Sequence, residues 1–300
     1  MHFGDAVIAR VRALGHPLCV GLDPHLRQIP RLFARGSMEI GDPETPAAVE
    51  AFLMAVLDRV TDRVAVVKPQ IAFFEQLGSA GIAVLERIVA RARDDGLLVL
   101  LDAKRGDIGS TAAGYAAAYL DPCAPCEVDA ITVNPYLGLD GLEPFAESAE
   151  RYGRGLFVLV KTSNPGSGDL QDRLLGDEKV PVSDTVARLL EPMMSRLSGP
   201  ATGWSSLGVV VGATYPEQGE RLRALLPNAL FLIPGYGAQG GSAADAMRSF
   251  LSGASGPEGG LVNSARGVIF PEAAAGASHA IAWERAIDAA LEATIEDLSR

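Results

Sequence analysis

The chain has 300 residues, of which 48% are hydrophobic and 21% are charged, so it can bury a large core and is not a disordered tail. Its 26 Lys and Arg against 37 Asp and Glu leave a net charge of −11, which argues against a nucleic-acid coat or a binder of anionic membranes, because both need a basic surface. A small anionic ligand is not excluded, since a pocket can be cationic inside an acidic shell.

The amino terminus mixes charged and apolar residues in the pattern of an amphipathic helix, which we predict over residues 2–14. It lacks the continuous apolar stretch of a signal peptide, and no later segment approaches the ~18 apolar residues of a membrane span. We therefore expect a soluble, cytoplasmic protein that binds neither membranes nor nucleic acid.

Three cysteines and four histidines leave little material for a metal site. Cys123 and Cys126 form one CAPC with no second pair, whereas a zinc site needs about four ligands at characteristic spacing. A redox-active pair is one interpretation of CAPC. We favour the other, small thiols in a reducing compartment, and we expect no metal.

Short runs rich in Val, Ile and Leu recur along the chain, each ending in polar or glycine residues and followed by a helical pattern. Continuous apolar runs of this kind indicate parallel strands covered on both faces. The predicted strands span residues 17–23, 63–70, 97–104, 130–135, 155–163, 207–214, 230–237 and 260–267. The predicted helices between them include 47–60, 81–96, 143–153 and 183–197, and a last helix is predicted over 279–298.

Strands that alternate with helices in this way predict a (β/α)8 TIM barrel, here a single α/β domain over residues 1–300. An open, doubly wound sheet is the alternative fold. The connections 24–48 and 164–181, after the first and fifth strands, are long and are expected on the rim at the carboxyl ends of the strands, where loops carry function. The Gly-, Ser- and Ala-rich stretches 252–260 and 273–279 are predicted to be surface loops.

Polar residues end several of these apolar strands. In barrels, active-site groups come from the carboxyl ends of the strands. A single charge at a strand end is usually only solvated, but several that converge on one mouth predict a site. The residues expected there are Asp23, Lys68, Asp102, Lys104, Ser163, Gln239 and Arg266.

The densest of these clusters is LLVLLDAKRGDIGST, beginning at residue 97. Side chains alternate along a strand, so Asp102 and Lys104 share the face of Leu98 and Leu100, which we take as the barrel interior, while Arg105 points to the other face. A structural ion-pair network is the plain explanation of these charges. Their burial would cost desolvation, however, which favours a functional role.

Two further predictions extend this cluster. Lys68 ends its own strand on the same face as Val64 and Val66. Asp107 and Thr111 lie four residues apart, so a helix that begins near them would align their side chains.

A phosphate site is predicted after the last two strands. PGYGAQGGS follows the seventh strand, and Asn263 to Gly267 end the eighth. Glycines let backbone N–H groups approach an anion, a helix beginning near Ser242 would add its positive end, and Arg266 could clamp a phosphate with two hydrogen bonds. The stretch 235–240 also matches GxGxxG, but no acidic residue ends the next strand, so we reject a dinucleotide site.

Taken together, these residues resemble the orotidine 5′-phosphate decarboxylase family, particularly its longer bacterial form. The resemblance runs over nearly the whole chain, in CVGLDPH, KPQIAFFE, LDAKRGDIGSTAAGYA, VKTSNPG, PGYGAQGG and the arginine after the last strand. The combination of DxKxxDIxxT with Lys68 and the late glycine loop is highly specific. The two long connections exceed those of compact family members, so contacts made by loops do not transfer.

The resemblance implies decarboxylation of orotidine 5′-monophosphate, without metal or cofactor, in a homodimer. Asp23 would bind ribose hydroxyls, and Ser163 the pyrimidine edge. Lys68, Asp102, Lys104 and Asp107 would form an alternating charged tetrad, with Lys104 as the proton donor. The residues expected to reach the neighbouring subunit are Asp107, Ile108 and Thr111, and those expected to hold the phosphate are Gly237, Gln239 and Arg266. The resemblance implies no roles for His25, Asn134 and Tyr236.

Two alternatives to this function stay open at this point. A magnesium-dependent sugar-phosphate decarboxylase or aldolase shares the DxK motif but needs further carboxylate ligands at neighbouring strand ends. A non-catalytic nucleotide-phosphate binding protein would use only the glycine loop and Arg266, and leaves Lys68 and Lys104 unexplained.

Overall fold

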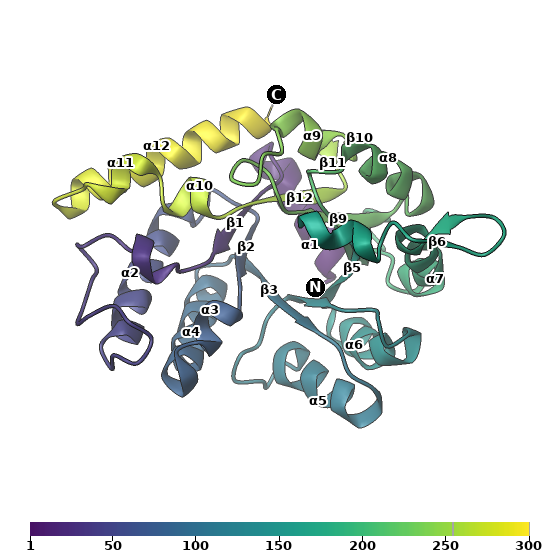
Figure 1. The fold of residues 1–300 in the computed structure, drawn as a ribbon, viewed down its shortest axis with the longest axis horizontal. Helices are drawn as coiled ribbons and strands as arrows, with labels where there is room; N and C mark the ends of the chain where they lie inside the picture. Colours follow the sequence, from purple (N-terminus) through teal and green to yellow (C-terminus); the bar gives the residue numbers. More distant parts are fainter. Residues whose placement is uncertain (254, 300) are drawn as a thin grey trace.

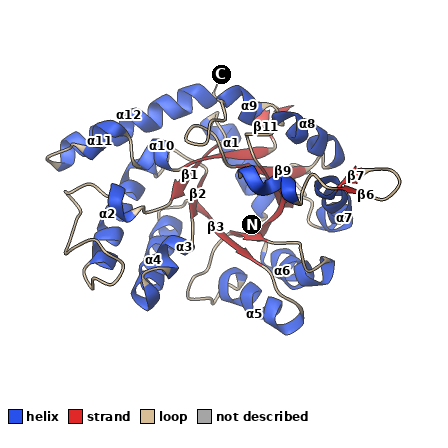
Figure 2. Cartoon of the chain, in the orientation of Figure 1, coloured by secondary structure: helices blue, strands red, loops and turns tan. Residues whose placement is uncertain are grey.

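The computed structural model describes residues 1–253 and 255–299, and within them eight parallel strands close into a barrel in chain order. Figure 2 shows these strands at the centre of the molecule with helices around them. The closed barrel confirms the predicted fold class and excludes the open, doubly wound sheet. Its strands are β1 (Leu18–Leu22), β2 (Val66–Pro69), β3 (Leu98–Arg105), β4 (Ala130–Val133), β5 (Gly155–Lys161), β8 (Ser205–Val211), β9 (Ala229–Ile233) and β12 (Gly260–Ser264).

Every predicted strand is present, but several are shorter than predicted. β9 ends at Ile233, where we expected residue 237, because Pro234 cannot donate to the ladder and Gly235 has a φ of +98°. β5 ends at Lys161 instead of 163. Apolar content marks where a strand runs but does not mark where its pairing stops.

Helices cover the outside of the barrel, as Figure 1 shows. The longer ones are α2 (Thr45–Val60), α4 (Gly78–Asp94), α5 (Gly109–Leu120), α6 (Leu139–Tyr152), α7 (Val182–Arg196), α8 (Pro216–Leu225) and α12 (Ala280–Leu298). Four short helices lie in the connections: α3 (Ala72–Glu75), α9 (Ala243–Met247), α10 (Arg266–Ile269) and α11 (Glu272–Ala275). In the described part of the chain, no helix is long and apolar enough to cross a membrane.

The connections contain more structure than predicted. A 3-10 helix, Leu26–Gln28, lies in the connection 24–48. The connection 164–181 holds a second 3-10 helix, Pro165–Asp169, and a hairpin of β6 (Leu174–Leu175) and β7 (Val180–Pro181), which projects beyond α7 in Figure 1. The described residues of 252–260 and 273–279 lie largely at the surface, as predicted, but they are not loops throughout, because β10 (Leu251–Gly253) pairs with β11 (Gly256–Glu258) and α11 reaches Ala275.

The core forms two shells, as alternation along the strands requires. Leu98 and Leu100 pack inside the barrel, while Val99 and Leu101 pack outward against the helices. The helix α1 (Phe3–Leu14) belongs to the inner shell. Its Phe3 ring meets Phe157 edge-on, with 6.1 Å between ring centroids. Because α1 packs on the buried inner residues, the open cavity of the barrel lies at the carboxyl ends of the strands.

Val64 is an exception to the predicted alternation. We expected it on the inner face with Val66 and Lys68, but it packs in the outer shell. The reason is that β2 begins only at Val66, so Val64 lies in the turn before the strand.

Candidate active site

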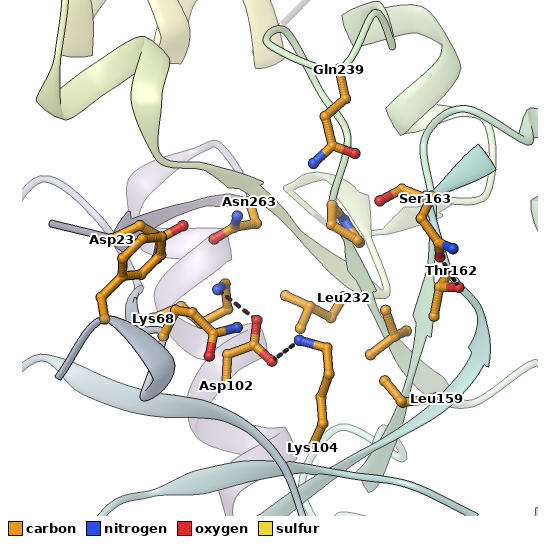
Figure 3. Close-up of a pocket in the computed structure, with 15 residues that line it drawn as sticks. Asp23, Lys68, Asp102, Lys104, Leu159, Thr162, Ser163, Leu232, Gln239 and Asn263 are labelled. Carbon is orange, nitrogen blue, oxygen red and sulfur yellow. Dashed lines mark hydrogen bonds and ion pairs between the residues drawn. The ribbon is translucent and has the colours of Figure 1, made fainter. Parts of the chain in front are cut away.

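A cavity of about 460 Å³ opens at the carboxyl ends of the strands. Six of the predicted site residues line it: Asp23, Lys68, Asp102, Lys104, Ser163 and Gln239. Gln70, Phe73, Leu159, Thr162, Asn164, Val210, Leu232, Pro234 and Asn263 complete the lining. Figure 3 shows the charged residues at the base of this cavity and Gln239 at its other end.

Asp102 lies between the two lysines and binds both. Its Oδ2 accepts a hydrogen bond from Lys68 Nζ at 3.0 Å, and its Oδ1 accepts one from Lys104 Nζ at 2.5 Å (Figure 3). The Lys68 side chain is 4% exposed and that of Lys104 is 43% exposed. The two ammonium groups therefore differ in exposure: both lysines line the cavity, but Lys68 is almost fully buried and Lys104 is open to solvent.

The charges of this cluster stabilise one another. Burial by itself lowers the pKa of Lys68, but the carboxylates of Asp102 and Asp23 outweigh it and raise that pKa above its usual value. Burial also opposes ionisation of Asp102, yet Lys68 and Lys104 hold its pKa below the usual range. Lys68 and Asp102 are therefore charged at neutral pH.

Lys104 reaches the cavity through irregular backbone. Its φ is +49°, and the pairing of β3 with β4 shifts register between Leu101 and Arg105. Such a backbone costs a non-glycine residue on the order of 1–3 kcal/mol and persists only where the surroundings hold it. The Arg105 side chain points to the outside of the barrel, as predicted, and forms an ion pair with Glu75.

Thr132 on β4 supports this bulge from inside the barrel. Its hydroxyl oxygen accepts the N–H groups of Ala103 at 2.9 Å and Lys104 at 2.8 Å. The same hydroxyl donates to Asp102 Oδ1 at 3.0 Å. Thr132 is fully buried and fixes both the carboxylate and the backbone that carries the lysine.

Two buried oxygens beside the charged cluster, Asp23 Oδ1 and Asn263 Oδ1, have no hydrogen-bond partner among the residues that the structure describes. Both residues line the cavity. Buried polar atoms are nearly always paired, so these two oxygens indicate a ligand with hydroxyl or N–H donors. Burial raises the pKa of Asp23, although Lys68 opposes the shift.

The glycine loop between β9 and α9 closes as a turn. Gly237 and Gly240 have φ values of +68° and +96°. The Gly237 N–H donates to Gly241 O, and Gly240 N–H donates to Gly237 O. Within the described chain, the N–H groups of Ala238 and Gln239 have no acceptor, so these two, and not Gly237, are free to bind an anion. Ser242 caps α9 as predicted, accepting from Asp245 N–H.

Arg266, which was predicted at the mouth of the barrel, is not among the residues that line the cavity. It is exposed, at the first position of α10, and makes no ion pair or hydrogen bond with the described residues. His25 lies nearby, with its ring 4.5 Å from that of Phe73. Burial lowers the pKa of His25, and Arg266 lowers it further while Asp23 opposes them. The lowered pKa favours a neutral His25 imidazole at pH 7.

Asp107, Ile108 and Thr111 lie outside the cavity of their own chain. The Asp107 carboxylate accepts the N–H of Ile108 at 2.8 Å, and Ile108 is 56% exposed. The structure does not align Asp107 with Thr111 on one helix, because α5 begins at Gly109.

Tyr236 and Asn134, for which the sequence offers no role, have structural partners. The Tyr236 hydroxyl donates to Asp297 on α12 at 2.6 Å, which ties the glycine loop to the last helix. Asn134 Oδ1 accepts the N–H of Tyr136. Burial raises the pKa of the Cys126 thiol to about 12, so this cysteine does not readily form a thiolate.

Sequence reasoning missed several of the residues that line or support the cavity. Gln70 and Asn263 follow the same alternation as Lys68 and Leu261, so strand parity would have found them. Thr132 is likewise a polar residue on the inner face of an apolar strand. Thr162 and Asn164 flank Ser163 in a loop, where no such pattern exists.

A barrel whose charged groups meet at the carboxyl ends of its strands defines the class, a (β/α)8-barrel enzyme. A family model described as orotidine 5′-phosphate decarboxylase / HUMPS family matches residues 16–281. The chain belongs to this family.

Individual curated relatives are named orotidine 5′-phosphate decarboxylase. Orotidine 5′-phosphate decarboxylase of Rhodopirellula baltica is 44% identical over 274 residues, covering 90% of this chain and 89% of that protein. The enzyme of that name from Salinispora tropica is 48% identical over 229 residues, covering 76% and 77%. Among solved structures, OMP decarboxylase of Leishmania donovani superposes with a TM-score of 0.74 at 33% identity, covering 99% of this chain and 98% of that one.

Proposed function

We propose that this protein decarboxylates orotidine 5′-monophosphate (OMP) to uridine 5′-monophosphate (UMP) in pyrimidine biosynthesis, through one barrel domain. The observation that carries the proposal is the alternation of Lys68, Asp102 and Lys104 at the base of the cavity. The named relatives, 44–48% identical in the two cases above, support the same substrate.

The chemistry of OMP explains why such a site is needed. Loss of CO₂ from C6 leaves an electron pair in a carbanion that no adjacent carbonyl delocalises. A fixed ammonium group aimed at C6 stabilises that charge, and protonation completes the reaction. In our proposal Lys104 does both: it faces the carbanion, transfers one proton from Nζ to C6, and regains a proton from solvent after UMP leaves.

The remaining residues bind and orient the substrate. Asp23 accepts from ribose hydroxyls, Ser163 contacts the pyrimidine edge, and Gln239 and Arg266 hold the 5′-phosphate. Phosphate binding supplies energy away from the reacting carbon that orients C6 against Lys104. Asp102 faces the substrate carboxylate, which it repels in the ground state.

The direct test is loss of orotate absorbance when purified protein is mixed with OMP, with and without EDTA. We expect equal turnover in both, because the proposed mechanism uses placed charges and neither metal nor cofactor. No three His, Cys, Asp or Glu residues of the described chain are grouped to hold a metal ion. Turnover that stops in EDTA and returns with Mg²⁺ would favour a magnesium-dependent enzyme, and binding of UMP without turnover would favour a binding protein.

Arg266→Ala should raise KM for OMP roughly 10–100-fold with a smaller change in kcat, the effect of losing a charge-assisted contact to the phosphate. Arg285→Ala provides the control, since Arg285 is also exposed but lies on α12. Steady-state kinetics of both variants measure the changes in KM and kcat for OMP. An unchanged KM in Arg266→Ala would remove this residue from the phosphate site.

We also propose that the protein acts as a homodimer in which Asp107, Ile108 and Thr111 reach the partner's cavity. Four exposed apolar side chains support this: Ile108, Tyr136, Leu137 and Leu139 are 56%, 77%, 48% and 39% exposed. They belong to neighbouring segments, since Gly141 lies against Asp107 O and Gly106 against Asn134 O. An apolar surface of this kind is typical of an interface.

Mixing inactive Lys104→Ala subunits with Asp107→Ala subunits should restore activity. In a twofold dimer with shared sites, each mixed dimer has one intact site, so random exchange gives about one quarter of the wild-type rate. Subunit exchange is verified by mass spectrometry of differently tagged chains. Complete exchange without recovery would place Asp107 outside the partner's site.

We also propose that the protein is located in the cytoplasm. Cys19, Cys123 and Cys126 are free thiols, which suits a reducing compartment.

A further inference from the structure

A further lysine, Lys161, is buried in the barrel, and the proposed mechanism gives it no role. It ends β5, and its side chain is 0% exposed. The pairing of β5 with β8 shifts register between Leu159 and Lys161, so Leu159 lines the cavity while Lys161 does not. Its Nζ lies 2.8 Å from both Asp172 oxygens and 4.2 Å from the centroid of the Tyr215 ring.

The three residues after Lys161 form one wall of the cavity: Thr162, Ser163 and Asn164. Figure 3 shows Thr162 and Ser163 together on that side. Asp172 follows Lys161 by 11 residues, so their ion pair closes the loop that carries this wall. The ion pair joins the end of β5 to the far end of the loop.

Gln171, beside Asp172, fastens the same wall directly. Its Oε1 accepts the N–H of Thr162 at 2.9 Å, and its Nε2 donates to Thr162 Oγ1 at 2.8 Å. On the opposite side, the Thr214 hydroxyl donates to Ser163 O at 3.3 Å. A Cβ atom added at Gly212, just after β8, would lie 2.7 Å from Ser163 Cα, so the backbone there packs closely against the wall.

We propose that Lys161 and Asp172 are positioning residues that hold the wall of Thr162, Ser163 and Asn164 against the pyrimidine base, and so set affinity for the base separately from affinity for the phosphate. The inference rests on the proposed function, which assigns Ser163 to the base. Its physical ground is that a fully buried ammonium requires a charged partner. In the described chain Asp172 is the acidic group in contact with Lys161. The Asp172 side chain is itself 39% exposed, so water can replace the carboxylate from that side, and the ion pair that fastens the loop to β5 is then lost.

The test compares two ligands that share the phosphate and differ in the base. Dissociation constants of UMP and of ribose 5-phosphate are measured by calorimetry for wild type and Asp172→Asn. We expect UMP affinity to fall roughly tenfold or more, as when one partner of a buried charge pair is removed, and ribose 5-phosphate affinity to change by less than about twofold. Asp172→Glu should restore most of the UMP affinity. Asp169→Asn, in the same loop, should leave both constants unchanged, because the Asp169 side chain has no hydrogen-bond or ion-pair partner among the described residues.

Gln171→Ala keeps the buried charge pair and removes only the amide contacts to Thr162, so it reports on the wall even if Asp172→Asn fails to fold. It should also weaken UMP selectively and raise KM for OMP more than it lowers kcat. Equal losses for both ligands, or no loss of UMP affinity in folded variants, would overturn the proposal. Wild-type turnover of OMP, measured alongside, separates this failure from a failure of the proposed function.

Discussion

Lys104→Ala should lower kcat for OMP by on the order of 10⁴-fold or more, because one ammonium group supplies both the electrostatic stabilisation and the proton. Lys104 is the more exposed cation of the charged cluster, with a side chain that is 43% exposed against 4% for Lys68. UMP should still bind, because the groups assigned to ribose and phosphate stay in place. Stopped assays with high enzyme concentration measure the residual rate.

The chain offers a matched control for this substitution. Lys179 is also a lysine in left-handed backbone, with a φ of +52° against +49° for Lys104, but it is exposed at the tip of the hairpin 174–181. Lys179→Ala therefore reproduces the backbone consequences of the change and should keep wild-type kcat. Appreciable turnover by Lys104→Ala would remove Lys104 from the reaction.

Asp102→Asn should destabilise the protein and also impair catalysis. Removing this carboxylate leaves Lys68 buried without its nearest partner and places two ammonium groups close together. Loss of one member of a buried ion pair typically costs about 3–5 kcal/mol of unfolding free energy. Urea denaturation at neutral pH measures the cost. Asp58→Asn, which breaks a surface pair with Arg91, should cost less than about 1 kcal/mol.

The directions of the pKa shifts determine how the effect of Asp102→Asn on the free energy of unfolding changes with pH. The pKa of Asp102 is depressed in the folded protein, so its stabilisation is present above the ordinary value of 3.8 and is lost as pH falls below it. The pKa of Lys68 is raised, so its stabilisation is present below 10.5 and is lost as pH rises through the folded value. The difference in stability between wild type and Asp102→Asn should be present at pH 7 and shrink in acid. Equal stability of the two proteins at pH 7 would contradict the prediction.

The sequence was sufficient to predict the charged base of the cavity. Asp102 and Lys68 end apolar strands, and alternation along a strand decides which face each side chain takes. The same rule extends to Asn263 and Gln70, which we did not predict because uncharged amides at strand ends do not stand out from loop residues. The barrel itself followed from the alternation of apolar runs with helical patterns.

The remaining parts of the site depend on backbone conformations that the alternation of side chains along a strand does not reveal. Alternation placed Lys104 correctly, yet its side chain reaches the cavity through a bulge and a positive φ that Thr132 holds. Gly237 was a reasonable candidate for phosphate, but its N–H turns back to Gly241. The surface position of Asp107 is settled only by where α5 begins.

The backbone at Lys104 has a consequence for protein engineering. Glycine adopts a φ of +49° without strain, so at this position it relieves a cost that lysine bears. A search for variants scored on folding alone does not protect Lys104, because glycine removes the backbone strain at the expense of the ion pair with Asp102. Selection on stability therefore has to hold this residue fixed to keep the proposed proton donor.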